Sequence, residues 1–349
     1  MAGMLSQWTY AAGQAARVAF FAGHHIAARR LGAPQKDSQG PAFKITKPRP
    51  SGRDFLSGMI DLFERDWSNI QAGLYASPPM ASDPLDLLKR ARAFMADVPS
   101  VDERRREHRH SDVLTEDRRQ RYPRYYLQNF HYQTDGWLSE ESARLYDFQV
   151  EALFAGTADA MRRQALAPIA RALRGRDQRK LTLLDVACGT GRFLEQVKHN
   201  WPRLKVCALD LSPDYLARAA KTLAPWRGVE MIEANAEAMP LADEGQDIAT
   251  CIYLFHELPP KTRSVVADEI VRVLKPGGMF VLVDSIQPGD GRGFEALMEF
   301  FPQAFHEPYY TSYLEWSAEE AFVARGLVKQ ESLPAFLSTV HVFSKPAQV

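Results

Sequence analysis

From about residue 180 onward, short runs of apolar residues alternate with longer segments in which apolar side chains recur every three or four positions. Short apolar runs predict buried strands, and the longer periodic segments predict amphipathic helices. The expected strands are residues 181–187, 204–209, 229–233, 248–254 and 279–284, and the expected helices between them are 192–200, 213–223 and 261–274. This alternation is typical of a parallel sheet with helices on both faces, so we expect an α/β fold.

The tail of the chain has a different pattern. Two further strands are expected at residues 327–332 and 337–344, and a short turn at Pro334 joins them. Strands joined by so short a connection can only pair antiparallel. The sheet is therefore expected to be mostly parallel, with an antiparallel end.

The first 32 residues are expected to form one helix. Its apolar face is predicted to consist of Leu5, Trp8, Ala12, Ala15, Ala19, Ala22 and Ile26. Arg17 and His24 lie opposite this face, and charged groups are costly at bilayer depth, so a membrane-spanning helix is not expected. Two interpretations stay open: a helix packed on its own protein, or a helix that contacts a membrane surface through residues 5–30.

We expect four segments along the chain. They are an N-terminal helix (1–32), a Pro- and Gly-rich linker (33–53), a helical extension with an aromatic cap (54–145) and the α/β domain (146–349).

Composition narrows the classes of function. The 349 residues include 43 Lys and Arg and 43 Asp and Glu, so the net charge of zero gives no general attraction to nucleic acid. Cys188, Cys207 and Cys251 lack CxxC spacing, so we expect neither a disulfide framework nor a metal site. Free cysteines fit a reducing compartment such as the cytoplasm, with membrane association through the first helix left open.

The segment Asp185–Phe193, with the sequence DVACGTGRF, follows an expected strand and opens an expected helix. Gly189 and Gly191 allow the backbone to approach an anionic ligand, which indicates either a dinucleotide or S-adenosylmethionine. A dinucleotide site needs a third glycine where this chain has Leu194. Asp185 would repel a pyrophosphate but could help to hold the ammonium group of a methionine moiety.

Asp210 strengthens this interpretation. It ends the second expected strand, about 20 residues after the glycines, where an acid accepts hydrogen bonds from the hydroxyls of an adenosine ribose. After the third strand, Asn235 and Ala236 could offer an amide side chain and a backbone amide to the edge of an adenine.

Five motifs then stand in order at the expected spacing: DVACGTG, LDLSPDYL, ANAEAMPLADEGQDIA, YLFHELP and LKPGGMFVLVD. Together they resemble the class I S-adenosylmethionine-dependent methyltransferases, in the branch that includes ubiquinone- and menaquinone-methylating enzymes. The resemblance covers about residues 146–344. It implies a Rossmann-like sheet of seven strands, S-adenosyl-L-methionine as cofactor and methyl transfer to a small, apolar or aromatic acceptor, with O- or C-methylation favoured.

The resemblance also implies roles for particular residues. The expected cofactor-binding residues are Tyr146, Asp185, Ala187, Cys188, Gly189, Gly191, Asp210, Leu211, Asn235, Ala236 and Tyr253. His256, at the end of the fourth strand, is the first candidate for a general base, and Glu257 is a weaker one. The alternative function is a catalytically silent scaffold with the same fold, although the intact set of Asp185, the glycines and Asp210 favours an enzyme.

Two aromatic clusters flank the α/β domain. We expect residues 122–146 to form a lid over the cofactor, facing a second cluster at residues 294–316 that follows the fifth strand. The predicted acceptor-lining residues are Tyr125, Tyr126, Phe130, Tyr132, Phe301, Tyr309 and Tyr310. Two aromatic walls would exclude water and suit a ring-bearing or lipid-like acceptor.

Overall fold

The computed structural model describes residues 2–32, 44–79, 84–290 and 293–347, with side chains from residue 6 onward. The strands are β1 (Thr182–Val186), β2 (Lys205–Asp210), β3 (Val229–Glu233), β4 (Gln246–Ile252), β5 (Leu274–Ser285), β6 (Val328–Ala335) and β7 (Ser338–Ser344). The helices before the sheet are α1 (Ala2–Leu31), α2 (Gly52–Gln71), α3 (Pro84–Arg106), α4 (Glu116–Arg121), α5 (Glu140–Leu153), α6 (Ala158–Arg163) and α7 (Leu166–Leu173). Those within it are α8 (Arg192–Asn200), α9 (Pro213–Leu223), α10 (Pro260–Val273), α11 (Glu295–Ala304), α12 (Tyr310–Leu314) and α13 (Ala318–Val323).

The seven strands form one sheet in the order β3-β2-β1-β4-β5-β7-β6. Strands β1 to β5 are parallel, and β7 runs antiparallel between β5 and β6. The chain leaves β1 towards β2 and β3 and later returns to β4 on the other side of β1. Loops at the carboxyl ends of β1 and β4 therefore diverge, and such a switch point is where open α/β sheets bind ligands.

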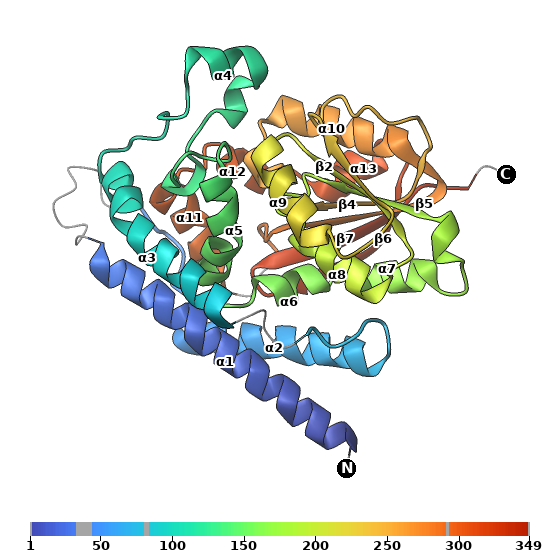
Figure 1. The fold of residues 1–349 in the computed structure, drawn as a ribbon, viewed down its shortest axis with the longest axis horizontal. Coiled ribbons are helices and arrows are strands. Elements are labelled where there is room, and N and C mark those ends of the chain that lie inside the picture. The colour runs from blue at the N-terminus through green and yellow to red at the C-terminus, as the bar shows by residue number, and fades with distance from the viewer. Residues whose placement is uncertain (1, 33–43, 80–83, 291–292, 348–349) are drawn as a thin grey trace.

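Alternation along the strands builds one core on each face of the sheet. Leu183 packs with α6, α7, α8 and α9, whereas its neighbour Leu184 packs on the opposite face with α10 and α13. The same division separates Val281 from Leu282 in β5. Figure 1 shows α8 and α9 on one side of the sheet and α10 and α13 on the other. The α/β fold expected from the periodicity is confirmed.

The N-terminal helices lie against the outside of this domain, with α1 and α2 below the sheet and α3 beside α5 in Figure 1. Asp66 of α2 is fully buried and ion-paired with Arg163 of α6, with 2.6 Å between Oδ2 and Nη2. The hydroxyls of Tyr10 and Tyr75 also donate to this carboxylate, at 2.5 and 2.8 Å. One buried carboxylate thus joins α1, α2 and the sheet domain.

The face of α1 that packs on the protein differs from the predicted one. Tyr10 and Phe21 are buried, and Arg17 reaches Glu151 and Asp159 at 2.8 and 2.9 Å. The predicted apolar face is turned to solvent instead: Trp8 is 73% exposed and Ile26 51%. The helix packs on its own protein through Tyr10, Phe21 and the ion pairs of Arg17, because burial of large aromatic side chains stabilises more than burial of a stripe made mostly of alanine. Contact of the exposed stripe with a membrane surface stays a prediction.

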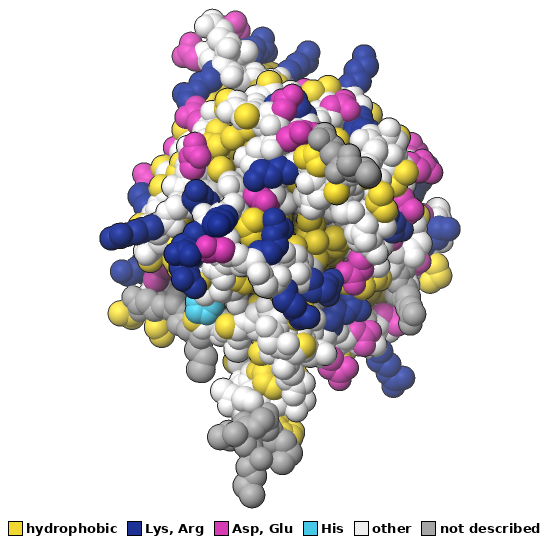
Figure 2. All heavy atoms as spheres, turned by 90° about the vertical axis from the view of Figure 1, so that its right-hand side faces the viewer, with side chains coloured by type: hydrophobic (Ala, Val, Ile, Leu, Met, Phe, Trp, Pro, Cys, Tyr) yellow, Lys and Arg dark blue, Asp and Glu magenta, His cyan; other side chains and the backbone are white. Residues whose placement is uncertain are grey.

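A further expectation concerns the linker. Of the expected linker 33–53, residues 33–43 lie outside the described residues, whereas Gly52 and Arg53 already belong to α2, whose N-cap is Ser51. At the top of Figure 1, α4 projects from the body of the molecule. Figure 2 shows the face that lies at the right of Figure 1, and basic and acidic side chains are mixed over it.

Among the described helices, none combines the length and apolar character that a bilayer crossing requires.

Candidate functional site

A cavity opens at the carboxyl ends of β1, β2 and β4, and it encloses about 820 Å³ of empty space that is partly open to solvent. Its lining residues are Tyr125, Tyr126, Trp137, Tyr146, Ala187, Gly189, Leu209, Asp210, Leu211, Tyr215, Ala234, Asn235, Ala236, Ile252, Tyr253, Leu254, Glu257, Leu258 and Val266. Eight of them are predicted cofactor-binding residues: Tyr146, Ala187, Gly189, Asp210, Leu211, Asn235, Ala236 and Tyr253. The fold brings these residues together from α5, the glycine loop and the ends of three strands.

The two positions in the loop after β1 require glycine for different structural reasons. Gly189 has φ of 55° and a side chain there would point into open space beside Tyr215, 4.0 Å away. Gly191 has φ of 75°, and its added Cβ would lie 3.1 Å from the Cβ of Ala219 in α9. Gly189 therefore leaves room for a ligand, whereas Gly191 allows α8 and α9 to approach closely. Gly191 does not line the cavity.

Asp210 lies between the ligand space and the glycine loop. Its Oδ2 accepts from the backbone N–H of Gly189 at 2.8 Å, and Oδ1 accepts from the N–H of Ser212 at 2.9 Å. Burial raises the pKa of Asp210 to about 6, although these backbone hydrogen bonds oppose the shift. Each carboxylate oxygen keeps a lone pair for a ligand hydroxyl.

Asp185 and Cys188 do not line the cavity. Asp185 is buried at the end of β1, where its Oδ1 accepts from the hydroxyl of Thr250 at 2.6 Å. Burial raises the pKa of Asp185 to about 7, and the Thr250 hydrogen bond opposes this shift. The free thiol of Cys188 is also buried, beside the loop. Neither of these two predicted cofactor-binding side chains is therefore among the residues that line the cavity.

Aromatic side chains hold the helical extension against the loop. Tyr146 of α5 packs edge-on to Tyr215 of α9, with ring centroids 5.4 Å apart. Asp147 accepts from the hydroxyl of Thr190 at 2.7 Å, which ties α5 to the glycine loop. Tyr215 lines the cavity but was not among the predicted residues, because on a predicted helix its ring is indistinguishable from core.

The predicted lid covers the cavity with only some of its residues. Tyr125, Tyr126 and Trp137 line the cavity, and the Tyr125 hydroxyl donates to Glu237 beside Asn235 at 2.6 Å. Phe130 lies behind them, stacked on Trp137 with 4.3 Å between ring centroids. Tyr132, Phe301, Tyr309 and Tyr310 are not among the residues that line this cavity, and their contact with the acceptor stays a prediction.

The two aromatic segments nevertheless contact each other, as their clustering suggested. The side chain of Gln128 donates to the Tyr309 hydroxyl at 3.0 Å and accepts at Oε1 from His306, 2.6 Å away. The backbone N–H of His131 donates to the carbonyl of His306 at 3.4 Å. Residues 294–316 thus support the lid from outside and do not form a second wall of the cavity.

His256 does not have the surroundings of a general base. Its Nδ1 lies 2.6 Å from the Asp284 carboxylate, and it is not among the cavity-lining residues. Burial lowers its pKa, but the adjacent Asp284 outweighs this effect and raises the pKa of His256 to about 10. A histidine that is already protonated at neutral pH cannot accept a proton. Its neighbours Glu257 and Leu258 line the cavity, and Glu257 is the titratable one of the two.

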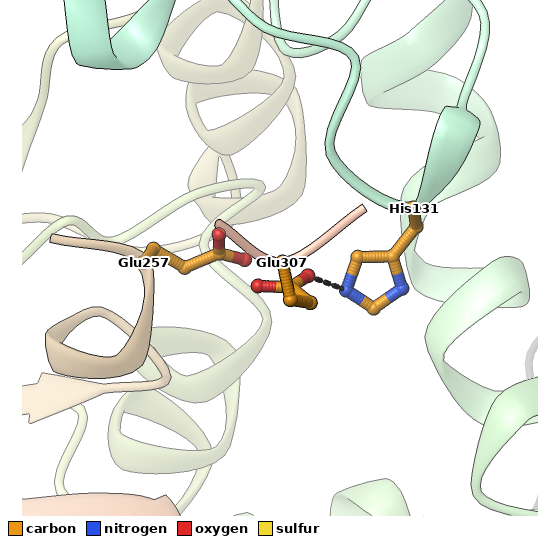
Figure 3. Close-up of side chains that lie close together, drawn as sticks. All are labelled: His131, Glu257 and Glu307. Carbon is orange, nitrogen blue, oxygen red and sulfur yellow. Dashed lines mark ion pairs between the residues drawn. The ribbon is translucent and has the colours of Figure 1, made fainter. Parts of the chain in front are cut away.

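Behind Glu257 lie two further titratable side chains, the buried Glu307 and the half-buried His131. Figure 3 shows Glu257, Glu307 and His131, which come from three separate parts of the chain. The Nε2 atom of His131 lies 2.6 Å from Oε1 of Glu307. Burial raises the pKa of Glu307 to about 8 and that of Glu257 well above its usual range. Glu307 is one of four glutamates in the aromatic segment 294–316, so no local pattern could single it out.

Comparison with known proteins agrees with this geometry. Residues 183–278 match the family described as "Methyltransferase domain". The matched residues include the glycine loop after β1 and Asp210 at the end of β2, so this part of the chain is a methyltransferase domain similar to those of the class I S-adenosylmethionine-dependent methyltransferases.

Two similar curated proteins are named as methyltransferases of ubiquinone/menaquinone biosynthesis or of demethylmenaquinone. The ubiquinone/menaquinone biosynthesis C-methyltransferase of Syntrophotalea carbinolica is 35% identical over 30% of this chain and 44% of its own length. The demethylmenaquinone methyltransferase of Listeria monocytogenes is 32% identical over 41% of this chain and 62% of its own length. The chain thus spans about half the length of these curated relatives. A solved S-adenosylmethionine-dependent methyltransferase from Aquifex aeolicus is similar at 20% identity, covering 47% of this chain and 81% of that one with a TM-score of 0.37.

Proposed function

We propose that the protein transfers the methyl group of S-adenosylmethionine to a small, apolar or aromatic acceptor. The observation that carries this proposal is one cavity that is lined both by Gly189 and Asp210 and by the rings of Tyr125, Tyr126 and Trp137. The glycine and the carboxylate suit an adenosyl ligand, and the rings give the same cavity an apolar wall.

The cofactor would be held by groups that are already positioned. Asp210 would accept hydrogen bonds from both ribose hydroxyls, and the bond from Gly189 keeps the carboxylate aimed along the loop. Asn235 and Ala236 line the part of the cavity beyond β3, where the adenine edge would lie. Leu211 would pack on the adenine face. Tyr146 and Tyr253 line the cavity as well and would enclose the methionine part.

Methyl transfer needs the acceptor in line with the C–S bond of the sulfonium, in a site from which water is excluded. The C–S bond breaks as the bond from the methyl carbon to the acceptor forms, and the neutral thioether leaves. Among the described residues that line the cavity, Asp210 and Glu257 are the carboxylates. Because Asp210 is engaged with the glycine loop, Glu257 is the carboxylate on the acceptor side.

The acceptor class follows from the lid and from the relatives. Three aromatic rings in the cavity wall favour stacking on a planar ring. The relatives named for demethylmenaquinone and ubiquinone act on quinone rings by their names, which supports a hydroquinone or phenol with an apolar substituent. Methylation at ring carbon or oxygen is open to such an acceptor.

A lipid-like acceptor would have to be reached from a membrane. Large apolar side chains of the N-terminal helices are exposed to solvent: Trp8, Ile26 and Leu31 of α1, Leu56 and Ile60 of α2, and Leu85 and Leu88 of α3. These side chains would give the helical extension a surface that adsorbs to lipid headgroups without crossing the bilayer.

The test begins with cofactor binding and proceeds to turnover. Wild-type protein is titrated calorimetrically with S-adenosylhomocysteine, and then incubated with methyl-labelled S-adenosylmethionine and a short-chain demethylmenaquinol. Binding together with label in the quinol supports the proposal. Binding without transfer to any hydroquinone or phenol favours the silent scaffold, and absence of binding by folded protein contradicts both the cofactor and the activity.

A further inference from the structure

Three side chains that can bind metal ions meet directly behind the cavity wall: His131, Glu257 and Glu307 (Figure 3). One ligand atom from each lies within 4.8 Å of the others. The Glu307 side chain is 0% exposed and that of Glu257 only 9%. Two buried acids and a half-buried histidine, whose side chain is 28% exposed, are thus brought together from segments that are more than 100 residues apart from first to last.

One carboxylate oxygen of each acid in this cluster lacks a partner. Oε2 of Glu257 and Oε2 of Glu307 are buried and have no hydrogen-bond partner among the described residues. The other oxygens face imidazoles: Oε1 of Glu307 lies 2.6 Å from Nε2 of His131, and Oε1 of Glu257 lies 3.6 Å from Nε2 of His256. Because His256 is already paired with Asp284, the carboxylates of Glu257 and Glu307 exceed the positive charge around them, and buried carboxylates need a balancing charge.

The surrounding backbone holds the cluster in place. His131 has a left-handed backbone with φ of 53°, a conformation that a residue with a side chain rarely adopts. Its N–H is bound to the carbonyl of His306, the residue before Glu307, at 3.4 Å. Phe301 and Phe305 pack against the imidazole, with ring centroids 5.5 and 5.4 Å away. The contact between the two aromatic segments thus orients His131 and Glu307, and it leaves the histidine partly exposed while Glu307 is fully buried.

We propose that His131, Glu257 and Glu307 bind one divalent cation, of the zinc or manganese type, next to the methyl-transfer cavity. One imidazole nitrogen and two carboxylate oxygens form a mixed ligand set suited to such ions, and two carboxylates neutralise the charge of the ion. Metal–ligand distances of about 2.0–2.2 Å require the side chains to close slightly around the ion. Three protein ligands leave coordination positions open for a further ligand.

This inference rests on the proposed function, and it narrows the chemical class of the acceptor. Because Glu257 lines the cavity, an open position of the ion can take an oxygen of the acceptor. A phenol or hydroquinone bound there loses its proton to solvent more readily, since the cation stabilises the phenolate. The phenolate then displaces the thioether from the methyl carbon, either through oxygen or through the activated ring carbon, which finally loses its own proton. The acceptor class is accordingly an oxygen-bearing aromatic ring.

The experiment measures metal binding directly, without turnover. Protein stripped with a chelator is titrated with ZnCl₂ and separately with MnCl₂ by calorimetry, and the metal retained after gel filtration is counted by mass spectrometry. We expect one equivalent in the wild type, and an affinity at least roughly tenfold lower in Glu307→Gln and His131→Gln. His341→Gln is the matched control, because His341 is also a buried histidine but binds Ser332 on the antiparallel end of the sheet.

Several outcomes would overturn the site. The site is refuted if the wild-type protein retains neither ion. It is also refuted if the variants retain the same equivalents of metal at the same affinity as the wild type. In either case the carboxyl groups of Glu257 and Glu307 share a proton instead of a metal ion. Near-ultraviolet circular dichroism checks that each variant is folded, and the Co²⁺ absorption spectrum of the wild type offers a readout independent of any variant. A protein that binds S-adenosylhomocysteine but fails to bind either metal ion would refute this inference alone. A protein that binds a metal ion but fails to bind S-adenosylhomocysteine would refute the proposed function.

Discussion

The backbone N–H of Gly189 donates a 2.8 Å hydrogen bond to the Asp210 carboxylate, so the loop after β1 and the end of β2 are joined before any ligand binds. The bond fixes the direction of a carboxylate whose other lone pairs face the cavity. A ligand therefore meets a binding group whose orientation costs little further entropy.

Replacing Asp210 should weaken cofactor binding. Asp210→Ala removes two charge-assisted hydrogen bonds to the ribose, so we expect about a hundredfold loss of affinity for S-adenosylhomocysteine, roughly 3 kcal/mol. Calorimetric titration measures the change. Asp214→Asn, in the first turn of α9 and outside the cavity lining, is the matched control. A folded Asp210→Ala protein with wild-type affinity would remove Asp210 from the site.

Cofactor affinity should also depend on pH. The pKa of Asp210 is raised to about 6, so below pH 6 its carboxyl is increasingly protonated and accepts ribose hydrogen bonds poorly. We expect affinity to be constant above about pH 7 and to fall about tenfold per unit well below pH 6. Titrations from pH 4.5 to 8 test this in the wild type and in Asp210→Asn. A variant profile that falls as steeply as that of the wild type would assign the dependence to another group.

The buried Asp66 should stabilise the junction between the helical extension and the sheet domain. Asp66→Ala leaves Arg163 charged and unpaired in the interior and frees the hydroxyls of Tyr10 and Tyr75. We expect a loss of about 3–5 kcal/mol in the free energy of unfolding, measured in urea. Asp61→Ala, exposed on the same helix, should change stability by less than about 0.5 kcal/mol. Equal midpoints for the two variants would contradict this role.

Trp137 should report ligand binding. Among the described tryptophans it is the one that lines the cavity, and it is stacked on Phe130. We expect S-adenosylhomocysteine to change the tryptophan emission of the wild type, and Trp137→Phe to abolish most of that change while retaining binding by calorimetry. Trp8→Phe, a substitution of an exposed tryptophan, serves as the control. An unchanged response in Trp137→Phe would place the ligand away from the lid.

Contact with a membrane surface would involve the exposed face of α1. Trp8 is 73% exposed, and a side chain of this size adds markedly to adsorption at a lipid surface. We expect sedimentation with phosphatidylglycerol-containing vesicles, reduced severalfold in Trp8→Ser. Thr9→Ser, the neighbouring position, is the control. Wild-type protein that stays in the supernatant at all vesicle concentrations would limit the proposed acceptor to molecules free in solution.

The sequence alone determined the α/β domain and the cofactor side of the cavity. Strand and helix periods, the glycines after β1 and Asp210 at the end of β2 are local patterns, because the backbone geometry they serve is completed within a few residues. The spacing of the cysteines, by contrast, predicted no metal site. Such spacing detects only ligands that are close together in the sequence and cannot detect ligands from distant segments.

Only the tertiary structure decided which side chains face one another across segments. It turned Tyr10 and Phe21 of α1 inward in place of the alanine-rich stripe, and it paired His256 with Asp284 so that Glu257 faces the cavity. It also brought His131 beside Glu307 through the contact between two aromatic segments. The physical reason is common to all three: burial and pairing of charges depend on neighbours in space, which the order of residues along the chain does not specify.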